Sequence, residues 1–143
     1  MRTFIVLLLV IIAANPLSAQ WILGGGVKYN TNNSFKAVAV NAKFGKDISE
    51  KFDLDLDASY YIASKATWAF DLNFHYRLLK IGDTFRLNPL AGINFTKTKS
   101  NKVYNSLLLG LSAKISGENY TYYLEPKWIL NNDQLSISVG VLF

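Results

Sequence analysis

The sequence has no cysteine and a single histidine, His75, among its 143 residues. Without cysteine, we expect neither a disulfide scaffold nor a lipoprotein anchored through that residue. One histidine also excludes a metal site built from several histidines. The longest apolar run, residues 4–14, has 11 residues, and it is too short to cross a bilayer as a helix.

That apolar run is typical of a secretory signal peptide. It follows a positively charged residue, Arg2, and it is followed by a small residue, Ala19, at a site suited to cleavage. We therefore expect residues 1–19 to be a signal peptide and residues 20–143 to form one domain. The alternative is a short buried helix, but no later segment has the helical periodicity of a packing partner.

The net charge is modestly positive, +5 for the whole chain and +4 once Arg2 is removed with the signal peptide. A secreted basic chain would meet nucleic acid only outside the cell. The sequence also has no basic stripe interleaved with stacking aromatics, so we expect no nucleic-acid partner.

A period of two dominates the rest of the chain and is plain in residues 134–143. One face of this segment is apolar, whereas the other is mostly small and polar, which predicts a strand. The apolar face consists of Leu135, Ile137, Val139, Val141 and Phe143.

Eight such segments follow one another, separated by short breaks rich in turn residues. Their lengths, about 9–11 residues, match strands that cross a bilayer at a tilt. The sequence predicts an all-β fold, an eight-stranded antiparallel up-and-down transmembrane β-barrel. Pro89 lacks a backbone donor, so pairing beside it should be weak or bulged. The expected strands are 21–29, 35–45, 52–62, 68–78, 85–95, 107–115, 120–130 and 134–143.

Aromatic residues on the apolar face lie close to the ends of these segments. Two such girdles are typical of membrane barrels, where rings mark both interfaces with water. A soluble sandwich has no reason to place its rings at both rims. The residues concerned include Trp21, Phe44, Phe52, Tyr60, Trp68, Tyr76, Phe95, Tyr120, Trp128 and Phe143.

The opposite face of the segments carries many charges, Lys28 among them. Such charges form an interior only when they pair with one another. The interior of an eight-stranded barrel is just wide enough for side chains. We therefore expect a paired plug in the lumen, a charge network of Lys43, Asp53, Asp55, Asp57, Asp71, His75, Arg77, Arg86, Lys114, Glu125 and Lys127.

The chain resembles the small OmpA/OmpX-type outer membrane barrels of Gram-negative bacteria, in the outer-membrane β-barrel domain family. The similarity rests on the signal peptide, on residues 21–27, on the strand at 88–94 and on residues 139–143. It implies a location in the cell outer membrane. It also implies that Val139, Val141 and Phe143 form the signal read by the barrel-assembly machinery. The short loops depart from the family pattern.

An even number of strands with both ends in the periplasm fixes the orientation. The breaks at 30–34, 63–66, 96–102 and 131–133 then face outward. Lys97, Lys99 and Lys102 on one of these loops are candidates for contact with anionic lipopolysaccharide. An ordinary solvated loop is the alternative interpretation.

Three local motifs do not support a chemical site. Asp53, Asp55 and Asp57 resemble the start of a calcium loop, but Ala58 and Ser64 replace the required Gly and Glu. His75 lies on the polar face, away from the lipid-facing side that a lipid esterase needs. The glycines at 24–26 lack a following Lys-Ser/Thr and fit a close approach at the barrel seam instead. We expect no catalytic residue, metal or cofactor.

The function predicted from the sequence is non-enzymatic: a structural or interaction role at the cell envelope, in contact with outer membrane lipid and lipopolysaccharide. Two alternatives remain open. One is an accessory subunit of a larger outer membrane secretion or transport complex, with other outer membrane proteins as partners. The other is a narrow passive pore.

Overall fold

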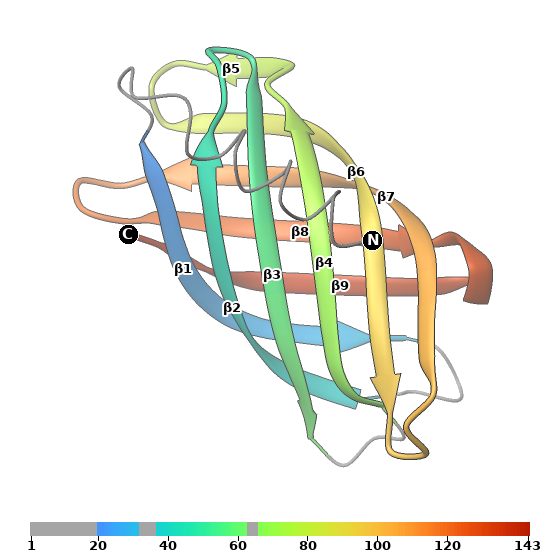
Figure 1. Cartoon of the computed structure of the whole chain (residues 1–143). Helices are drawn as coiled ribbons and strands as arrows, with labels where there is room; N and C mark the ends of the chain where they lie inside the picture. The colour runs from blue at the N-terminus through green and yellow to red at the C-terminus, as the bar shows by residue number, and fades with distance from the viewer. Residues whose placement is uncertain (1–19, 32–36, 63–65) are drawn as a thin grey trace.

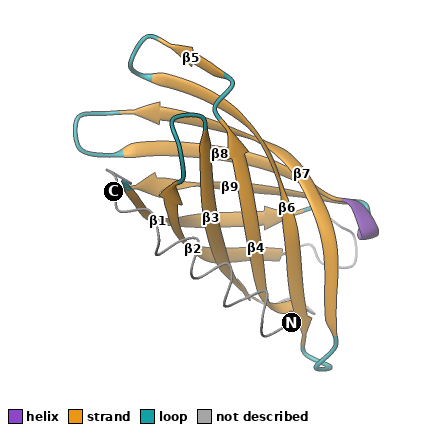
Figure 2. Ribbon diagram, turned by 45° about the horizontal axis from the view of Figure 1, so that its top comes forward, coloured by secondary structure: helices purple, strands orange, loops and turns teal. Residues whose placement is uncertain are grey.

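The computed structural model describes residues 20–31, 37–62 and 66–143. The expected signal peptide, residues 1–19, lies outside the described residues. The described chain is almost entirely β-structure, apart from turns and one short 3-10 helix, η1, at Leu130–Asn132 (Figure 2). Within these ranges, no helix is long and apolar enough to span a membrane.

Nine strands form one antiparallel sheet, and eight of them close into a barrel (Figure 1). Strand β1 pairs with both β2 and β9, and the extra pairing of β4 with β6 leaves no gap in the ring. The strands are β1 Trp21–Asn30, β2 Ala37–Asp47, β3 Phe52–Ile62, β4 Ala66–Tyr76, β5 Leu79–Ile81, β6 Phe85–Thr98, β7 Val103–Ser116, β8 Thr121–Ile129 and β9 Gln134–Leu142.

The two ends of the barrel carry different turns. The terminal rim is the end at which β1 begins and β9 finishes, and it carries the turns at 48–51, 82–84 and 117–120. A backbone hydrogen bond from Phe143 to Leu23 and another from Asp47 to Gln20 join its strands. The opposite rim carries the turn at 99–102 and η1.

The predicted eight-stranded fold is confirmed, but several segment boundaries differ from those expected, and two of these differences have a clear physical cause. The segment expected at 68–78 is β4, which ends at Tyr76, and the next residues form β5 instead of a simple turn. Strand β5 continues the line of β4 beside β6. His75 pairs with Leu90 and Leu79 pairs with Leu87, so four positions on the β4–β5 side match three positions on β6, and the extra residue is on the β4–β5 side. This is the signature of a bulge.

Pro89 of β6 lies at that irregularity. On the side of β4 and β5 the pairing is interrupted between Leu87 and Leu90, whereas toward β7 it is continuous, with Pro89 opposite Leu111. The weak pairing expected from its missing donor is therefore present on one side. The pairing of β7 with β8 is also interrupted beside Pro126, between Lys127 and Leu124 of β8, and the sequence does not predict this interruption.

The second correction concerns the break expected at 96–102. Strand β6 continues to Thr98, so only residues 99–102 form the turn before β7 begins at Val103. Lys97 is consequently a strand residue, paired with Trp68 of β4 and with Val103 of β7.

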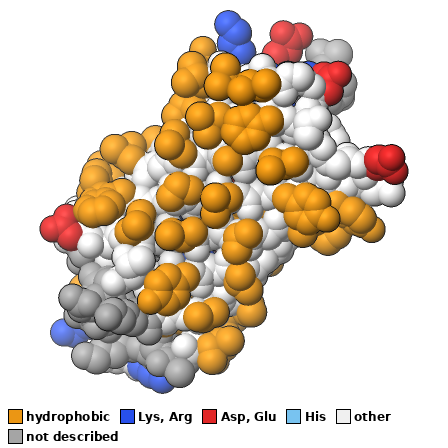
Figure 3. All heavy atoms as spheres, turned by 180° about the vertical axis from the view of Figure 1, so that it is seen from behind, with side chains coloured by type: hydrophobic (Ala, Val, Ile, Leu, Met, Phe, Trp, Pro, Cys, Tyr) orange, Lys and Arg blue, Asp and Glu red, His pale blue; other side chains and the backbone are white. Residues whose placement is uncertain are grey.

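The outer wall of the barrel is apolar. Large hydrophobic side chains point outward along every long strand, as Leu23, Leu56 and Leu107 illustrate with 58%, 41% and 60% exposure. Figure 3 shows such side chains spread over one face of the barrel. Monomeric soluble proteins rarely expose contiguous apolar patches larger than a few hundred Å². A wall of this kind fits a hydrocarbon environment instead.

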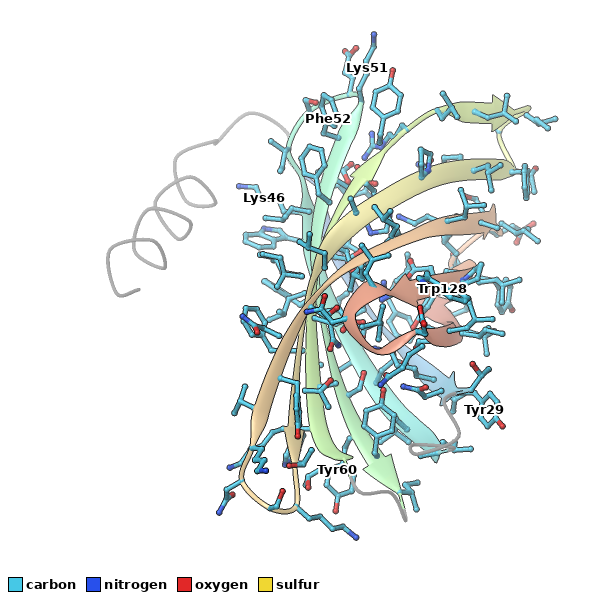
Figure 4. All side chains as sticks on the ribbon, turned by 90° about the vertical axis from the view of Figure 1, so that its right-hand side faces the viewer. Tyr29, Lys46, Lys51, Phe52, Tyr60 and Trp128 are labelled. Atoms are coloured by element: carbon cyan, nitrogen blue, oxygen red, sulfur yellow. The ribbon has the colours of Figure 1, made fainter. Side chains whose placement is uncertain are left out.

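Aromatic rings lie at both ends of the outer wall. Phe52 marks the terminal end of β3 and Tyr60 the other end (Figure 4). The ring of Tyr60 packs on that of Trp68 at 4.8 Å between centroids, and Tyr120 packs edge-on against Phe143 at 5.6 Å.

Candidate functional site: a charge network in the lumen

The interior of the barrel is filled by charged and polar side chains. Because successive residues of a strand point to opposite faces, the outward leucines of β3 alternate with inward aspartates. Purely apolar buried clusters are small by comparison: Ala37, Ala39, Tyr61 and Ala69 in one, and Leu90, Leu108 and Ile129 in the other.

Two lysines share two aspartates in one half of the network. Asp57 and Asp71 face each other across β3 and β4. Lys28 Nζ lies 2.8 Å from Asp71 Oδ2 and 3.3 Å from Asp57 Oδ1, and Lys127 Nζ lies 3.1 Å from an oxygen of each. Strands β1 and β8 thus supply the cations that neutralise an adjacent pair of like charges.

The other half of the network is centred on Lys43. Its Nζ lies 2.7 Å from Glu125 Oε2 and 3.4 Å from Asp55 Oδ2. Lys127 links the two halves through a 3.6 Å contact with Glu125. His75 Nε2 lies 2.6 Å from the same oxygen of Asp55, Oδ2.

Neutral polar groups occupy the remaining carboxylate oxygens. Asn73 donates to Asp55 at 2.7 Å and Asn94 donates to Asp71 at 2.6 Å. The Ser112 hydroxyl donates to Glu125 Oε1 at 2.9 Å. A buried charge is tolerated when it is both paired and hydrogen-bonded, and these carboxylates meet both conditions.

Near the terminal rim the charges form a separate group. Arg77 contacts Asp47 at 2.7 Å and also forms an ion pair with Asp53. Lys114 Nζ lies 3.5 Å from the other oxygen of Asp53. Among the described residues Arg86 has no carboxylate partner, and its guanidinium donates to the Ser116 hydroxyl at 3.3 Å.

Two charged residues outside the expected network, Lys28 and Asp47, take part in these ion pairs. Lys28 lies on the predicted polar face, but its place between Asp57 and Asp71 depends on the stagger of β1 against β3 and β4. Asp47 falls in the break expected between the strands at 35–45 and 52–62, but it is the last residue of β2 and forms an ion pair with Arg77.

The contacts of His75 do not form a nucleophile and base pair. Its ring is fully buried, and within the described part of the chain no hydroxyl is hydrogen-bonded to either ring nitrogen. Asp55, His75 and Glu125 offer ligand atoms within 4.8 Å of one another and so have the spacing of a metal site. The Lys43 ammonium already contacts both carboxylates, so a cation occupies that position.

The remaining predicted residues lie on the surface. Lys97, Lys99 and Lys102 are exposed at the opposite rim. Val139 and Phe143 point outward with 47% and 68% exposure, and Val141 is half-buried on the same face of β9.

Three glycines at the β1–β9 seam accommodate close approach of the backbones. A Cβ atom on Gly26 would collide with the carbonyl oxygen of Val139, and one on Gly140 would collide with that of Gly25. The glycine-rich stretch is therefore required by the seam, in line with the interpretation that it is no phosphate loop.

Comparison with known proteins gives similarity in fold alone. No family model and no curated protein matches the sequence. Among solved structures, the N-terminal β-barrel domain of Pseudomonas aeruginosa OprF is 17% identical, with a TM-score of 0.63 over 87% of this chain and 96% of that one. A de novo designed transmembrane β-barrel is 18% identical, with a TM-score of 0.63 over 86% and 92% of the two chains.

Neisserial surface protein A is a third neighbour, 11% identical with a TM-score of 0.61 over 87% of this chain and 96% of that one. The natural neighbours are small outer membrane barrels of eight strands. The resemblance stated from the sequence is thus confirmed at the level of the fold, and an outer membrane location accords with it.

Proposed function

We propose that the protein is a non-enzymatic outer membrane barrel whose lumen is closed by its own ion pairs and whose role at the envelope is structural or interactive. The observation that carries this proposal is the cross-strand network of Lys28, Lys43 and Lys127 with four carboxylates. All seven side chains are at most 2% exposed. The charges of this central network are paired with one another, so it offers no free charged group to a substrate.

The network also acts as an internal brace. Its ion pairs connect β1 with β3 and β4, β2 with β3 and β8, and β8 with β3 and β4. Removing one partner of a buried pair leaves an uncompensated charge, at a cost of about 3–5 kcal/mol. Opening a water path would require several such pairs to separate together. We therefore favour a closed lumen over a passive pore.

Conductance measurement tests this proposal directly. Purified protein reconstituted in planar bilayers should give no stable ion current, because the paired side chains fill the lumen. A variant with both Lys43→Ala and Glu125→Ala, which removes the central pair and much of its volume, serves as the comparison. Steady unit conductance of the unmodified protein at low voltage would support the pore instead.

The lysines at the opposite rim suit a contact with lipopolysaccharide. Lys99 and Lys102 lie on the turn, and Lys97 projects from the end of β6 beside Trp68. An aromatic residue and a lysine on adjacent strands at the interface are a favourable combination for an anionic headgroup.

Assembly is the second interaction that we propose. The outward residues Val139, Val141 and Phe143 would be read by the barrel-assembly machinery during insertion, as the family resemblance implies. An accessory role in a larger complex would use the apolar outer wall, and the native size of the protein in mild detergent distinguishes a lone barrel from a subunit.

A further inference from the structure

A cavity of about 230 Å³ lies at the terminal rim, apart from the central network. Its wall includes the ends of β1, β2, β6, β7 and β9 together with the turn at 117–120. Glu118 and Asn119 in this wall are exposed, so solvent reaches the cavity. Its charged lining consists of Asp47, Asp53, Arg77, Arg86, Lys114 and Glu118.

Both aspartates of this wall are already engaged. Arg77 forms ion pairs with Asp47 and Asp53, and Lys114 makes a 3.5 Å contact with Asp53. Arg77 and Lys114 thus pair with the two aspartates of the cavity wall. No ion pair within the described ranges includes Arg86 or Glu118.

Arg86 is the group without an adequate partner. Its guanidinium donates to the Ser116 hydroxyl at 3.3 Å, and its Nε is buried without any hydrogen-bond partner. Arg86 also stands directly opposite Lys114 in the β6–β7 register. Like charges placed directly opposite each other destabilise a sheet, and an anion between them would offset the repulsion.

We infer that this cavity binds a small oxyanion, a phosphate or carboxylate group, held by Arg86 and Lys114. The planar guanidinium matches such a group with two parallel hydrogen bonds, and the ammonium adds a point charge. The volume is below the usual range of about 300–1,000 Å³ for drug-sized ligands, so it suits a single phosphate or a short carboxylate. This inference does not depend on the lumen being closed.

A free phosphate ion and a lipid headgroup present the same chemistry, and two measurements separate them. In the first, inorganic phosphate is titrated into the protein in an uncharged detergent while the arginine side-chain NMR signals are followed. In the second, the protein is placed in phosphatidylcholine nanodiscs with and without phosphatidylglycerol. A shift of the Arg86 signal that saturates with phosphate identifies a free anion, and one seen only with phosphatidylglycerol identifies a headgroup. No shift in either experiment overturns the inference.

Variants test whether the named side chains form the site. Arg86→Gln should weaken binding by about tenfold or more, as expected for loss of a charge-assisted hydrogen bond. Lys51→Gln is the matched control, since Lys51 is an exposed cation on the same rim and does not line the cavity (Figure 4). An equal loss in both variants would mean general attraction to a basic rim and would overturn the site.

Glu118 supplies a test with the opposite sign. It lines the same cavity, so its carboxylate competes with any anion that enters. Glu118→Gln should therefore strengthen phosphate binding several-fold while leaving the fold intact. A heat-dependent shift in electrophoretic mobility verifies that the variant is folded. Weaker binding in a folded Glu118→Gln variant would contradict the inference.

Discussion

Tyr123 of β8 and Gly140 of β9 face each other, and a Cβ atom on Gly140 would lie 2.7 Å from the Tyr123 hydroxyl oxygen. The phenol occupies the space that this glycine leaves free, and its oxygen accepts a hydrogen bond from Asn41 of β2 at 3.1 Å. One side chain thus extends across the seam strands and joins β8 to β2 above the Lys43 cluster, where Lys43 Nζ lies 4.9 Å from its ring centre.

Replacing this glycine should therefore weaken the barrel. Gly140→Ala forces a shift of both Tyr123 and the backbone carbonyl of Gly25. Overpacking of this kind costs about 1–3 kcal/mol, which urea unfolding from lipid vesicles can measure. Gly25→Ala is the matched control, because its Cβ would point outward with its nearest contact, Asn41 O, at 3.1 Å. Equal stability of the two variants would mean that the Tyr123 contact is unimportant.

Lys127 offers the sharpest test of the central network. Its ammonium is shared by Asp57 and Asp71 at 3.1 Å and by Glu125 at 3.6 Å. We expect Lys127→Met to lower the free energy of unfolding by about 3–5 kcal/mol, because it leaves buried carboxylates short of a cation. The same measurement on Lys51→Met, at an exposed turn, should change stability by less than about 0.5 kcal/mol. A loss below 1 kcal/mol in Lys127→Met would mean that water or other cations replace the ammonium.

Much of the fold could be predicted because an alternating strand fixes which face each residue belongs to. The outward leucines and inward aspartates of β3 illustrate this. The end of β6 could not be placed in this way, since Thr96, Lys97 and Thr98 lack apolar alternation. They stay in the strand because they pair with β7 or β4 beyond the apolar belt.

The partners within the network were harder to predict. Alternation gives the face of each residue but not its height in the barrel, which depends on the stagger between strands. Contacts between neighbouring strands are easier to predict, because an antiparallel pair joined by a short turn brings Asp53, near the start of β3, beside Arg77, just after the end of β4. Contacts across the lumen are harder to predict. Lys43 and Glu125 are 82 positions apart in the chain, and only the closed barrel brings them together.

A double-mutant cycle on Lys43 and Glu125 separates pairing from simple burial. Each single change, Lys43→Met or Glu125→Gln, removes the nearest partner of the other charge, at 2.7 Å, so the double variant should lose less than the sum. We expect an interaction energy of about 1–3 kcal/mol. Lys80 and Asp83 form a matched control at a similar distance, 2.8 Å, but with side chains 58% and 99% exposed. Solvent screening should make their coupling much smaller, and similar coupling in the two pairs would contradict a special role for burial.

The lysines of the opposite rim provide the last prediction. Changing Lys97, Lys99 and Lys102 together to Gln should weaken lipopolysaccharide binding by about 1 kcal/mol for each lysine, with a smaller effect at high salt. The control changes Lys46, Lys51 and Lys80 to Gln, which removes the same charge from the terminal rim. Binding is measured by titrating purified lipopolysaccharide into the protein in nanodiscs. If the two triple variants bind equally, net charge governs the interaction and the rim lysines are an ordinary solvated surface.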